Sequence, residues 1–381
     1  MRVVITTPFF LPVLNGMTFA TLQHAVMLRR RGYSVAIMAE CAEGMRASVM
    51  AYLKNQGIDF FPAEISGSGL LTRPVVGDVD AVLRSLVTYR ADVVVVEGRY
   101  SWAYHVVPKM KAIGLKVAFV SHGAAAVTAA STIQRLLKSV AYWYYYVLHE
   151  RRIVGHLDSV AVLSAHEDSD RFCDAKIYRR FGLSPFIVPN TSIEYAARGL
   201  HKCADNGMGI RIAVIGEMSP LKNQLAAIKI FNPDDWVGVV NFYFPEENEY
   251  SLAVQQAASE KGLNKFRFIV GLDRERIINA LSRVDLVVVF SKTEAQPLAI
   301  IDGLACGIPF VSTPVGCVPS MKGGLVCDIE GMAAVIRGLA ENPTSLARLS
   351  SEAADYYDRF HSEDMVATAL DSFVKHAVRR L

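Results

Sequence analysis

Cysteine is scarce in this 381-residue chain, and its six cysteines form neither a Cys-x-x-Cys pair nor a zinc-binding spacing. This argues against a disulfide-stabilised secreted domain and favours reduced cysteines in a cytosolic protein. Long apolar runs are also missing. Hydrophobic residues make up 52% of the chain, but no run reaches the roughly 18 residues that a spanning helix needs. The apolar N-terminus contains Pro8 and Pro12 and lacks a small-x-small cleavage site, so we do not expect a secretory signal peptide.

A large excess of charge of one sign is missing as well. The chain has 40 basic and 37 acidic residues, a net charge of +3. Proteins that bind duplex nucleic acid usually have a larger basic footprint, so we expect no nucleic-acid partner. The balance is uneven, because residues 1–195 carry 21 basic and 15 acidic groups and the remainder carries 19 and 22. The basic first half would suit a surface that lies near anionic lipid.

Two common nucleotide-binding motifs are absent from the sequence. No Gly-x-Gly-x-x-Gly follows the first predicted strand and no Walker sequence occurs, which excludes the nicotinamide and P-loop classes. Asp78-Val-Asp80 and Asp168-Ser-Asp170 have a spacing that binds metal in some enzymes, but neither triplet follows a clear buried strand. Since no cluster of His or Cys has metal-ligand spacing either, we expect no metal site.

Short apolar runs alternate with helical stretches in two similar halves, which is typical of parallel sheets covered on both faces. A polar stretch over residues 196–209 separates the halves and is predicted to be a linker. The sequence therefore predicts an α/β protein with two doubly wound Rossmann-like domains, residues 1–195 and 210–381, whose last helix, residues 362–379, packs on either domain. Ligands bind such sheets at the carboxyl ends of the strands, which predicts a site in the cleft between the domains. Strands are predicted at residues 3–6, 34–39, 92–96, 116–120, 159–163, 186–188, 210–215, 237–242, 266–270, 286–290 and 310–313.

The most informative segment runs from Ser291 to Pro309. Pro297 suits the first turn of a helix, so Glu294 lies just before that helix and Asp302 about one and a half turns into it. At about 1.5 Å per residue, the two carboxylates are on the order of 10 Å apart. This distance suits a ligand with hydroxyl groups at both ends and negative charge between them, such as a nucleotide diphosphate sugar.

This segment resembles the Glu-x7-Glu motif of retaining GT-B glycosyltransferases of the family 4 type. The resemblance implies that Glu294 binds the donor sugar and Asp302 the ribose, with Gln296 and Leu298 beside them in the donor site. Asp302 departs from the family pattern, because its side chain is one methylene shorter than Glu. The alternative reading is a carboxylate at a helix N-terminus and an unrelated surface Asp.

A second segment, from Ile212 to Lys222, is similar to the family's Gly-Arg-x4-Lys sequence, whose Arg and Lys hold the diphosphate. Lys222 occupies the Lys position, whereas Glu217 occupies the Arg position. A carboxylate there would repel a diphosphate. We therefore expect another cation, Lys292 or Arg274, to compensate, or the activity to be weak.

Features of the first half and of the base-binding loop resemble the family less specifically. His122 directly follows a predicted strand and resembles the family's active-site histidine, which contacts the donor sugar near its reacting carbon. Gly16 resembles the glycine loop after the first strand, where the backbone approaches the phosphates. Gly271 matches the loop that flanks the nucleotide base.

Acceptor residues are predicted in the first domain. Glu97, Arg99 and Tyr100 follow a predicted strand and are expected to border the acceptor. Residues 131–153 are predicted to form a helix that combines aromatic side chains with basic flanks. That composition suits a membrane interface and a lipid-linked acceptor, but a half-buried packing helix is the slightly favoured interpretation.

The resemblance implies a metal-independent hexosyltransferase that acts with retention and needs no cofactor beyond its co-substrate, a nucleotide diphosphate sugar, with UDP favoured over GDP. Its catalytic residues would be His122, Lys222 and Glu294. The acceptor would be a glycan or a lipid-linked glycan in cell-surface polysaccharide synthesis, reached in the cytoplasm with peripheral membrane contact through the first domain. Two alternatives remain open, a nucleotide-sugar epimerase and a non-catalytic sugar-nucleotide binder.

Overall fold

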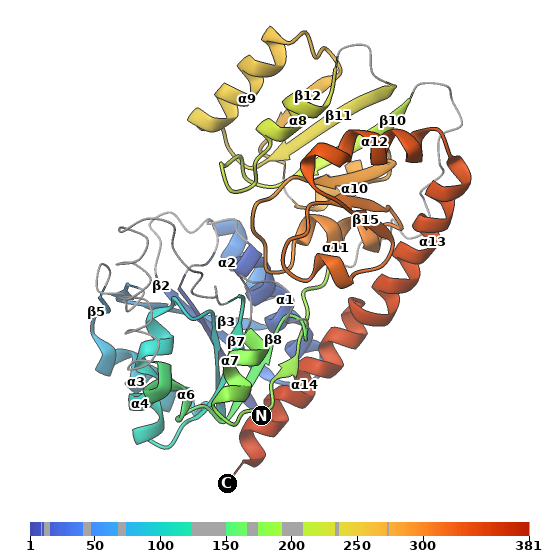
Figure 1. Cartoon of the computed structure of the whole chain (residues 1–381). Helices are drawn as coiled ribbons and strands as arrows, with labels where there is room; N and C mark the ends of the chain where they lie inside the picture. The colour runs from blue at the N-terminus through green and yellow to red at the C-terminus, as the bar shows by residue number, and fades with distance from the viewer. Residues whose placement is uncertain are drawn as a thin grey trace, which may run out of the picture. The chain divides into compact units, whose positions relative to one another are not determined.

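The computed structural model describes residues 1–8, 10, 16–40, 47–67, 74–123, 150–165, 174–192, 209–232, 236–272 and 274–380 (Figure 1). The chain divides into two compact units. The N-terminal unit consists of Met1–Pro189 together with Val366–Leu381, and the C-terminal unit consists of Asn190–Met365. The predicted linker lies outside the described residues except for Gly209, and the division between the units falls before it, at Pro189 and Asn190.

A seven-stranded parallel sheet forms the centre of the N-terminal unit, in the order β3-β2-β1-β6-β7-β8-β9. Because β1 lies between β2 and β6, the direction of winding reverses at the β1/β6 pair, which is where doubly wound sheets bind ligands. A separate antiparallel pair joins β4 (Ile65–Ser66) to β5 (Val76–Gly77). The seven strands are β1 Arg2–Thr7, β2 Ser34–Glu40, β3 Ile58–Ala63, β6 Val93–Glu97, β7 Lys116–Ser121, β8 Ser159–Val162 and β9 Phe186–Ile187.

Helices cover both faces of this sheet, which explains why its strands are apolar without alternation. In β1, Val3 and Ile5 pack into the core that faces α1 and α14, whereas Val4 packs into the core that faces α3 and α4. The helices of the unit are α1 Gly16–Arg30, α2 Ala47–Asn55, α3 Val79–Thr88, α4 Trp102–Ala112, α6 Arg151–Val154, α7 Asp174–Arg180 and α14 Glu363–Arg379.

The last helix, α14, returns to the N-terminal unit. Val366, Leu370, Phe373 and Ala377 form one helical stripe that is buried in the same core as Val3 and Ile5. Since the stripe is fully buried, α14 is an integral part of this unit although it comes last in the sequence.

The C-terminal unit contains a six-stranded parallel sheet in the order β12-β11-β10-β13-β14-β15, with its switch point between β10 and β13. Helices α8, α9 and α12 cover one face and α10 and α11 the other, while α13 contacts both cores. The strands are β10 Ile210–Ile215, β11 Val237–Phe244, β12 Phe266–Val270, β13 Leu286–Val289, β14 Phe310–Ser312 and β15 Gly324–Val326. The helices are α8 Leu225–Ile230, α9 Glu249–Glu260, α10 Arg274–Leu281, α11 Leu298–Ala305, α12 Ile329–Ala340 and α13 Pro343–Phe360, with a 3-10 turn at Val318–Ser320.

The predicted fold class, two doubly wound α/β sheets, is confirmed. Residues 220–224, which include Lys222, form a turn, and helix α8 begins after it at Leu225. Asp78 has a structural role, since its side chain caps α3 by accepting a hydrogen bond from the Ala81 backbone at 2.8 Å. The other triplet, Asp168-Ser-Asp170, lies outside the described residues. None of the described helices combines the length and the apolar character needed to cross a bilayer.

Candidate functional site

The residues predicted to hold the sugar and the diphosphate lie in two loops at the switch point of the C-terminal sheet. Lys222 is in the turn between β10 and α8, and Glu294 is in the loop between β13 and α11. The Lys292 backbone N–H donates to the Leu221 carbonyl at 2.8 Å and so ties one loop to the other. These two side chains are therefore placed by neighbouring strands and by a direct backbone contact between their loops.

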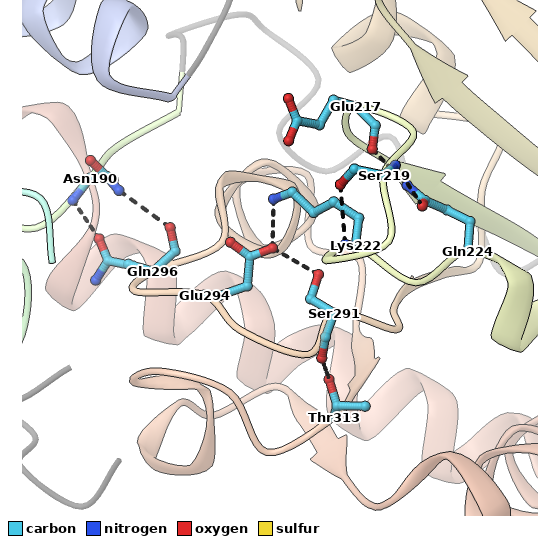
Figure 2. A network of polar contacts seen from close by, with 9 residues as sticks. All are labelled: Asn190, Glu217, Ser219, Lys222, Gln224, Ser291, Glu294, Gln296 and Thr313. Atoms are coloured by element: carbon cyan, nitrogen blue, oxygen red, sulfur yellow. Dashed lines mark hydrogen bonds and ion pairs between the residues drawn. The ribbon is translucent and has the colours of Figure 1, made fainter. Parts of the chain in front are cut away.

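Lys222 and Glu294 form an ion pair in which the Lys222 Nζ lies 2.6 Å from the Glu294 Oε1 (Figure 2). The Ser291 Oγ donates to the same oxygen at 2.8 Å. Ser291 is itself held by Thr313, whose Oγ1 donates to the Ser291 carbonyl at 2.6 Å. Both contacts of the Glu294 carboxylate use Oε1, which leaves Oε2 to accept a hydrogen bond from a ligand. Ser291 was not among the predicted site residues, although it stands three residues before Glu294.

Glu217 follows β10 and presents a carboxylate where the resemblance expects an arginine. Its backbone carbonyl accepts a hydrogen bond from the Gln224 Nε2 at 2.8 Å (Figure 2), whereas its side chain is exposed. The Lys222 backbone N–H is held in the same turn by the Ser219 Oγ at 3.3 Å. The turn thus orients its backbone firmly and leaves the Glu217 carboxylate facing solvent.

Asp302 is buried in α11, and its Oδ1 accepts two hydrogen bonds. The Arg274 Nη2 lies 2.6 Å away and the Ser192 Oγ 2.7 Å away. An unrelated surface Asp is excluded, because Asp302 is only 4% exposed. Arg274 was also one of the two cations expected to compensate for the negative charge of Glu217. Arg274 is instead buried beside Asp302, and the exposed Lys292 remains the better candidate.

Gln296 has a bracing role in addition to its predicted place in the donor site. Its Oε1 accepts a hydrogen bond from the Asn190 backbone N–H at 2.6 Å, and its carbonyl accepts from the Asn190 Nδ2 at 3.4 Å (Figure 2). The Asn190 carbonyl in turn accepts from the His361 Nδ1 at 2.8 Å. Burial lowers the pKa of His361, which keeps this ring neutral. Leu298, the first residue of α11, lies directly beyond this braced segment and is partly exposed.

A turn after β14 packs against the backbone of the Glu294 loop. Gly316 has a φ of +51°, and a Cβ there would lie 2.2 Å from the Ala295 carbonyl oxygen and 2.3 Å from that of Glu294. The next residue, Cys317, donates its backbone N–H to the Ala295 carbonyl at 3.1 Å. Only glycine fits this close approach of two backbones.

In the N-terminal unit, His122 directly follows β7 and contacts Glu97, the last residue of β6. The His122 Nε2 lies 2.5 Å from the Glu97 Oε2, and the His24 Nδ1 lies 2.8 Å from the Glu97 Oε1. Burial by itself would raise the pKa of Glu97, but the charge of His24 and the hydrogen bonds from both rings lower it to about 2. Glu97 is therefore a buried carboxylate that stays ionised between two imidazole rings.

Of the three predicted acceptor residues, two are buried and one is partly exposed. Glu97 and Arg99 are 0% and 3% exposed, and the Arg99 Nη2 lies 3.0 Å from Glu150, so neither offers a surface to an acceptor. The Tyr104 hydroxyl also donates to Glu150, at 2.5 Å, and burial raises the pKa of Glu150. Tyr100 is partly exposed and keeps its predicted role as a candidate. Arg99 and Tyr104 thus both contact the buried Glu150 rather than solvent.

The remaining predicted features are less defined. Gly16 is the exposed first residue of α1, and Gly271 follows β12 and donates its backbone N–H to the Phe244 carbonyl at 3.0 Å. The aromatic stretch of the helix predicted over residues 131–153 lies outside the described residues, of which only Glu150 to Ile153 belong to that range. Within the described residues, no group of three or more His, Cys, Asp or Glu side chains could hold a metal ion.

Comparison with known proteins agrees with this geometry. Residues 15–170 match the family described as "Glycosyl transferase 4-like domain", and residues 209–342 match the family described as "Glycosyl transferases group 1". By sequence and fold, the chain belongs with the GT-B glycosyltransferases. The two matches cover the loops that carry Lys222, Glu294 and His122, and they do not favour an epimerase.

Individual relatives of this GT-B chain are distant. It is 25% identical over 204 residues to the D-inositol 3-phosphate glycosyltransferase of Mycobacterium marinum, a match that covers 49% of the chain and 44% of that protein. It is 27% identical over 131 residues to the glycogen synthase of Mycobacterium tuberculosis, a match that covers 32% of each protein. The matches therefore span less than half the length of these curated relatives.

Two solved structures share the fold over nearly the whole chain. Anabaena Alr3699/HepE in complex with UDP-glucose has a TM-score of 0.68 at 16% identity, and the match covers 98% of each chain. Sucrose-phosphate synthase from Thermosynechococcus elongatus has a TM-score of 0.74 at 14% identity, again over 98% of each chain. At these identities the likeness concerns the fold.

Proposed function

We propose that this protein transfers a sugar from a nucleotide diphosphate sugar to a hydroxyl group of an acceptor, with retention of configuration at the reacting carbon. The observation that carries the proposal is the ion pair between Lys222 and Glu294 at the β10/β13 switch point. A cation for the leaving diphosphate and a carboxylate for the sugar hydroxyls are what this chemistry requires, and they lie side by side.

The donor would replace the ion pair with contacts of its own. The ammonium group of Lys222 turns to the diphosphate, and the Glu294 Oε2 accepts a hydrogen bond from a sugar hydroxyl while Ser291 keeps Oε1 in place. Asp302 retains Arg274 and Ser192 on Oδ1 and offers Oδ2 to a ribose hydroxyl. Gln296 and Leu298 lie between these carboxylates in the sequence and complete the donor side.

The mechanism is assigned from the resemblance. The acceptor hydroxyl attacks from the face that the leaving diphosphate vacates, and a phosphate oxygen takes the acceptor's proton. Lys222 neutralises charge as it develops on the diphosphate, so that neither a metal ion nor a further cofactor is required. His122 is assigned to the donor sugar on the resemblance alone. UDP is favoured as the nucleotide of the donor, because HepE, which shares the fold, binds UDP-glucose.

The acceptor is proposed only as a class, a glycan or lipid-linked glycan of a cell-surface polysaccharide. The net charge of +6 that residues 1–195 carry would favour peripheral contact with an anionic membrane. Co-sedimentation with vesicles that contain anionic lipid tests this part separately. An absence of binding at low salt removes the membrane contact and leaves the donor chemistry unaffected.

The decisive experiment measures transfer from UDP- and GDP-sugars to a panel of acceptors, with and without EDTA, and reads the anomeric configuration of the product by NMR. We expect Lys222→Ala and Glu294→Gln each to lower kcat at least about 100-fold. Lys229→Ala is the matched control, because Lys229 is an exposed lysine at the end of α8. Wild-type turnover in either site variant would overturn the assignment.

Three other outcomes would overturn parts of the proposal. Loss of transfer in EDTA would replace the metal-independent mechanism. Conversion of the donor without an acceptor would indicate an epimerase. Donor binding without turnover across the panel would indicate a non-catalytic binder, for which the Glu217 carboxylate would be the physical reason.

A further inference from the structure

The carboxylate of Glu97 determines which nitrogen of each neighbouring ring carries a proton. An ionised carboxylate can only accept hydrogen bonds, so both contacting nitrogens must donate. His24 donates through Nδ1 and His122 through Nε2, at 2.8 and 2.5 Å. When His122 is neutral, its Nδ1 is therefore bare and is the hydrogen-bond acceptor of the ring.

The three residues are held by three different elements. Glu97 ends β6, His122 follows β7, and His24 lies in α1. The β6 and β7 strands pair in register up to Glu97 and Val120, and the Gly98 backbone N–H extends the ladder by donating to the Val120 carbonyl at 2.9 Å. The distance from Glu97 to the His122 ring is thus fixed by the sheet.

The carboxylate and the ring of His24 are buried at this strand end. Glu97 is 0% exposed and His24 is 2% exposed, whereas the His122 side chain is 11% exposed. A buried carboxylate without donors is costly, so His24 supplies the second N–H that keeps Glu97 charged.

We propose that Glu97 is a positioning residue for the sugar-transfer reaction, which fixes the ring and the Nε2–H tautomer of His122, and that His24 supports it by holding the carboxylate ionised. The proposal rests on the function proposed above for the role of His122. The part of the proposal that concerns the tautomer of His122 does not depend on that function. Glu97 thereby acts inside the protein rather than on the acceptor side, where the sequence placed it.

The first measurement is the 15N spectrum of the protein labelled at histidine, with the His122 signals assigned by their loss in His122→Asn. In spectra recorded at a pH where the ring is neutral, we expect its proton on Nε2 in the wild type. In Glu97→Gln the amide offers one acceptor and one donor, so the two rings cannot both donate, and we expect one of them to change tautomer. A His122 ring protonated at Nδ1 in the wild type, or averaging between tautomers, would overturn the proposal.

The second measurement separates positioning from stability. We expect Glu97→Gln to lower kcat about 10- to 100-fold with less than a threefold change in the donor KM, since the donor is held by the C-terminal unit. Glu40→Gln is the matched control, because Glu40 also ends a strand of this sheet, β2, but is partly exposed. We expect it to leave kcat unchanged.

Variants of His24 provide a conservative rescue. The Nδ2–H of asparagine can occupy the position of the His24 Nδ1–H, so His24→Asn should lose much less kcat than His24→Leu, which has no donor. If the two variants lose equal activity at equal melting temperature, His24 does not act through Glu97. If the tautomer is as expected but Glu97→Gln retains wild-type kcat, the positioning role is wrong and the proposed function stands. If no sugar is transferred by the wild type, the proposed function fails and the spectrum still decides the tautomer.

Discussion

Replacing Gly316 with alanine should displace the loop that carries Glu294. The new Cβ would lie 2.2 and 2.3 Å from the carbonyl oxygens of Ala295 and Glu294. An ordinary contact between carbon and oxygen is about 3.3 Å, so the loop must move by roughly 1 Å. The left-handed conformation of residue 316 costs a further 1–2 kcal/mol for a residue with a Cβ. With the overpacking included, we expect a loss of about 2–5 kcal/mol from the free energy of unfolding.

The assay compares melting temperature and kcat with those of a matched variant. For a unit of this size, such a loss lowers the melting temperature by at least about 4 °C. A misplacement of about 1 Å at Glu294 should lower kcat about 100-fold. Gly338→Ala is the control, because Gly338 lies in helix α12 with no heavy atom within 4 Å of an added Cβ, and it should stabilise the protein by up to about 1 kcal/mol. A Gly316→Ala variant with wild-type melting temperature and kcat would refute the argument that this glycine supports the site.

Two further predictions concern charge. Glu217→Arg should tighten donor binding about tenfold. Lys292→Ala should weaken donor binding more in the wild type than in the Glu217→Arg background, and titration calorimetry with the nucleotide can measure both. Equal losses of affinity in the two backgrounds would exclude compensation by Lys292. Acid should destabilise the N-terminal unit through Glu97, whose pKa is lowered from 4.5 to about 2, so its stabilising contribution is present above about pH 4.5 and is lost as the pH falls toward 2. Urea unfolding should show that the free energy of unfolding falls less between pH 5 and pH 3 in Glu97→Gln than in the wild type. An equal fall in both proteins would contradict the assignment of Glu97 as ionised in the folded state.

The fold could be predicted because its strands are buried on both faces. Runs such as Val93–Val96 and Leu286–Val289 are apolar throughout, and all eleven predicted strands are present with ends that differ by at most two residues. Strands β3 and β15, at the edges of their sheets, were missed, as was the short antiparallel pair of β4 and β5. Strand β3 is interrupted by Asp59 and Pro62, and β15 begins with Gly324, so neither carries the apolar run that the prediction needed.

The site could be predicted only where local spacing determines it. The sequence places Glu294 before a helix and Asp302 within it, and the structure agrees. It could not indicate that Asp302 pairs with Arg274, because 28 residues separate them and only the approach of α10 to α11 brings them together. The prediction that Glu97 borders the acceptor was wrong for the same reason, since it required Glu97 to be exposed. Its partner His24 lies 73 residues away, on a helix that covers the strand end.

The charge arrangement of the donor side suggests how the chain tolerates Glu217. Arg274 is committed to Asp302, and moving it toward a diphosphate would leave a buried carboxylate without its cation, which typically costs 3–5 kcal/mol. The Lys292 side chain, by contrast, is exposed, and its backbone N–H donates to the Leu221 carbonyl in the turn that contains Lys222. We therefore expect two lysines on joined loops, Lys222 after β10 and Lys292 after β13, to face the diphosphate, a role that the resemblance assigns to an arginine and a lysine of one loop. On this argument we expect the carboxylate at residue 217 to weaken donor binding without abolishing it, and the Asp302–Arg274 pair to contact the ribose rather than the phosphates.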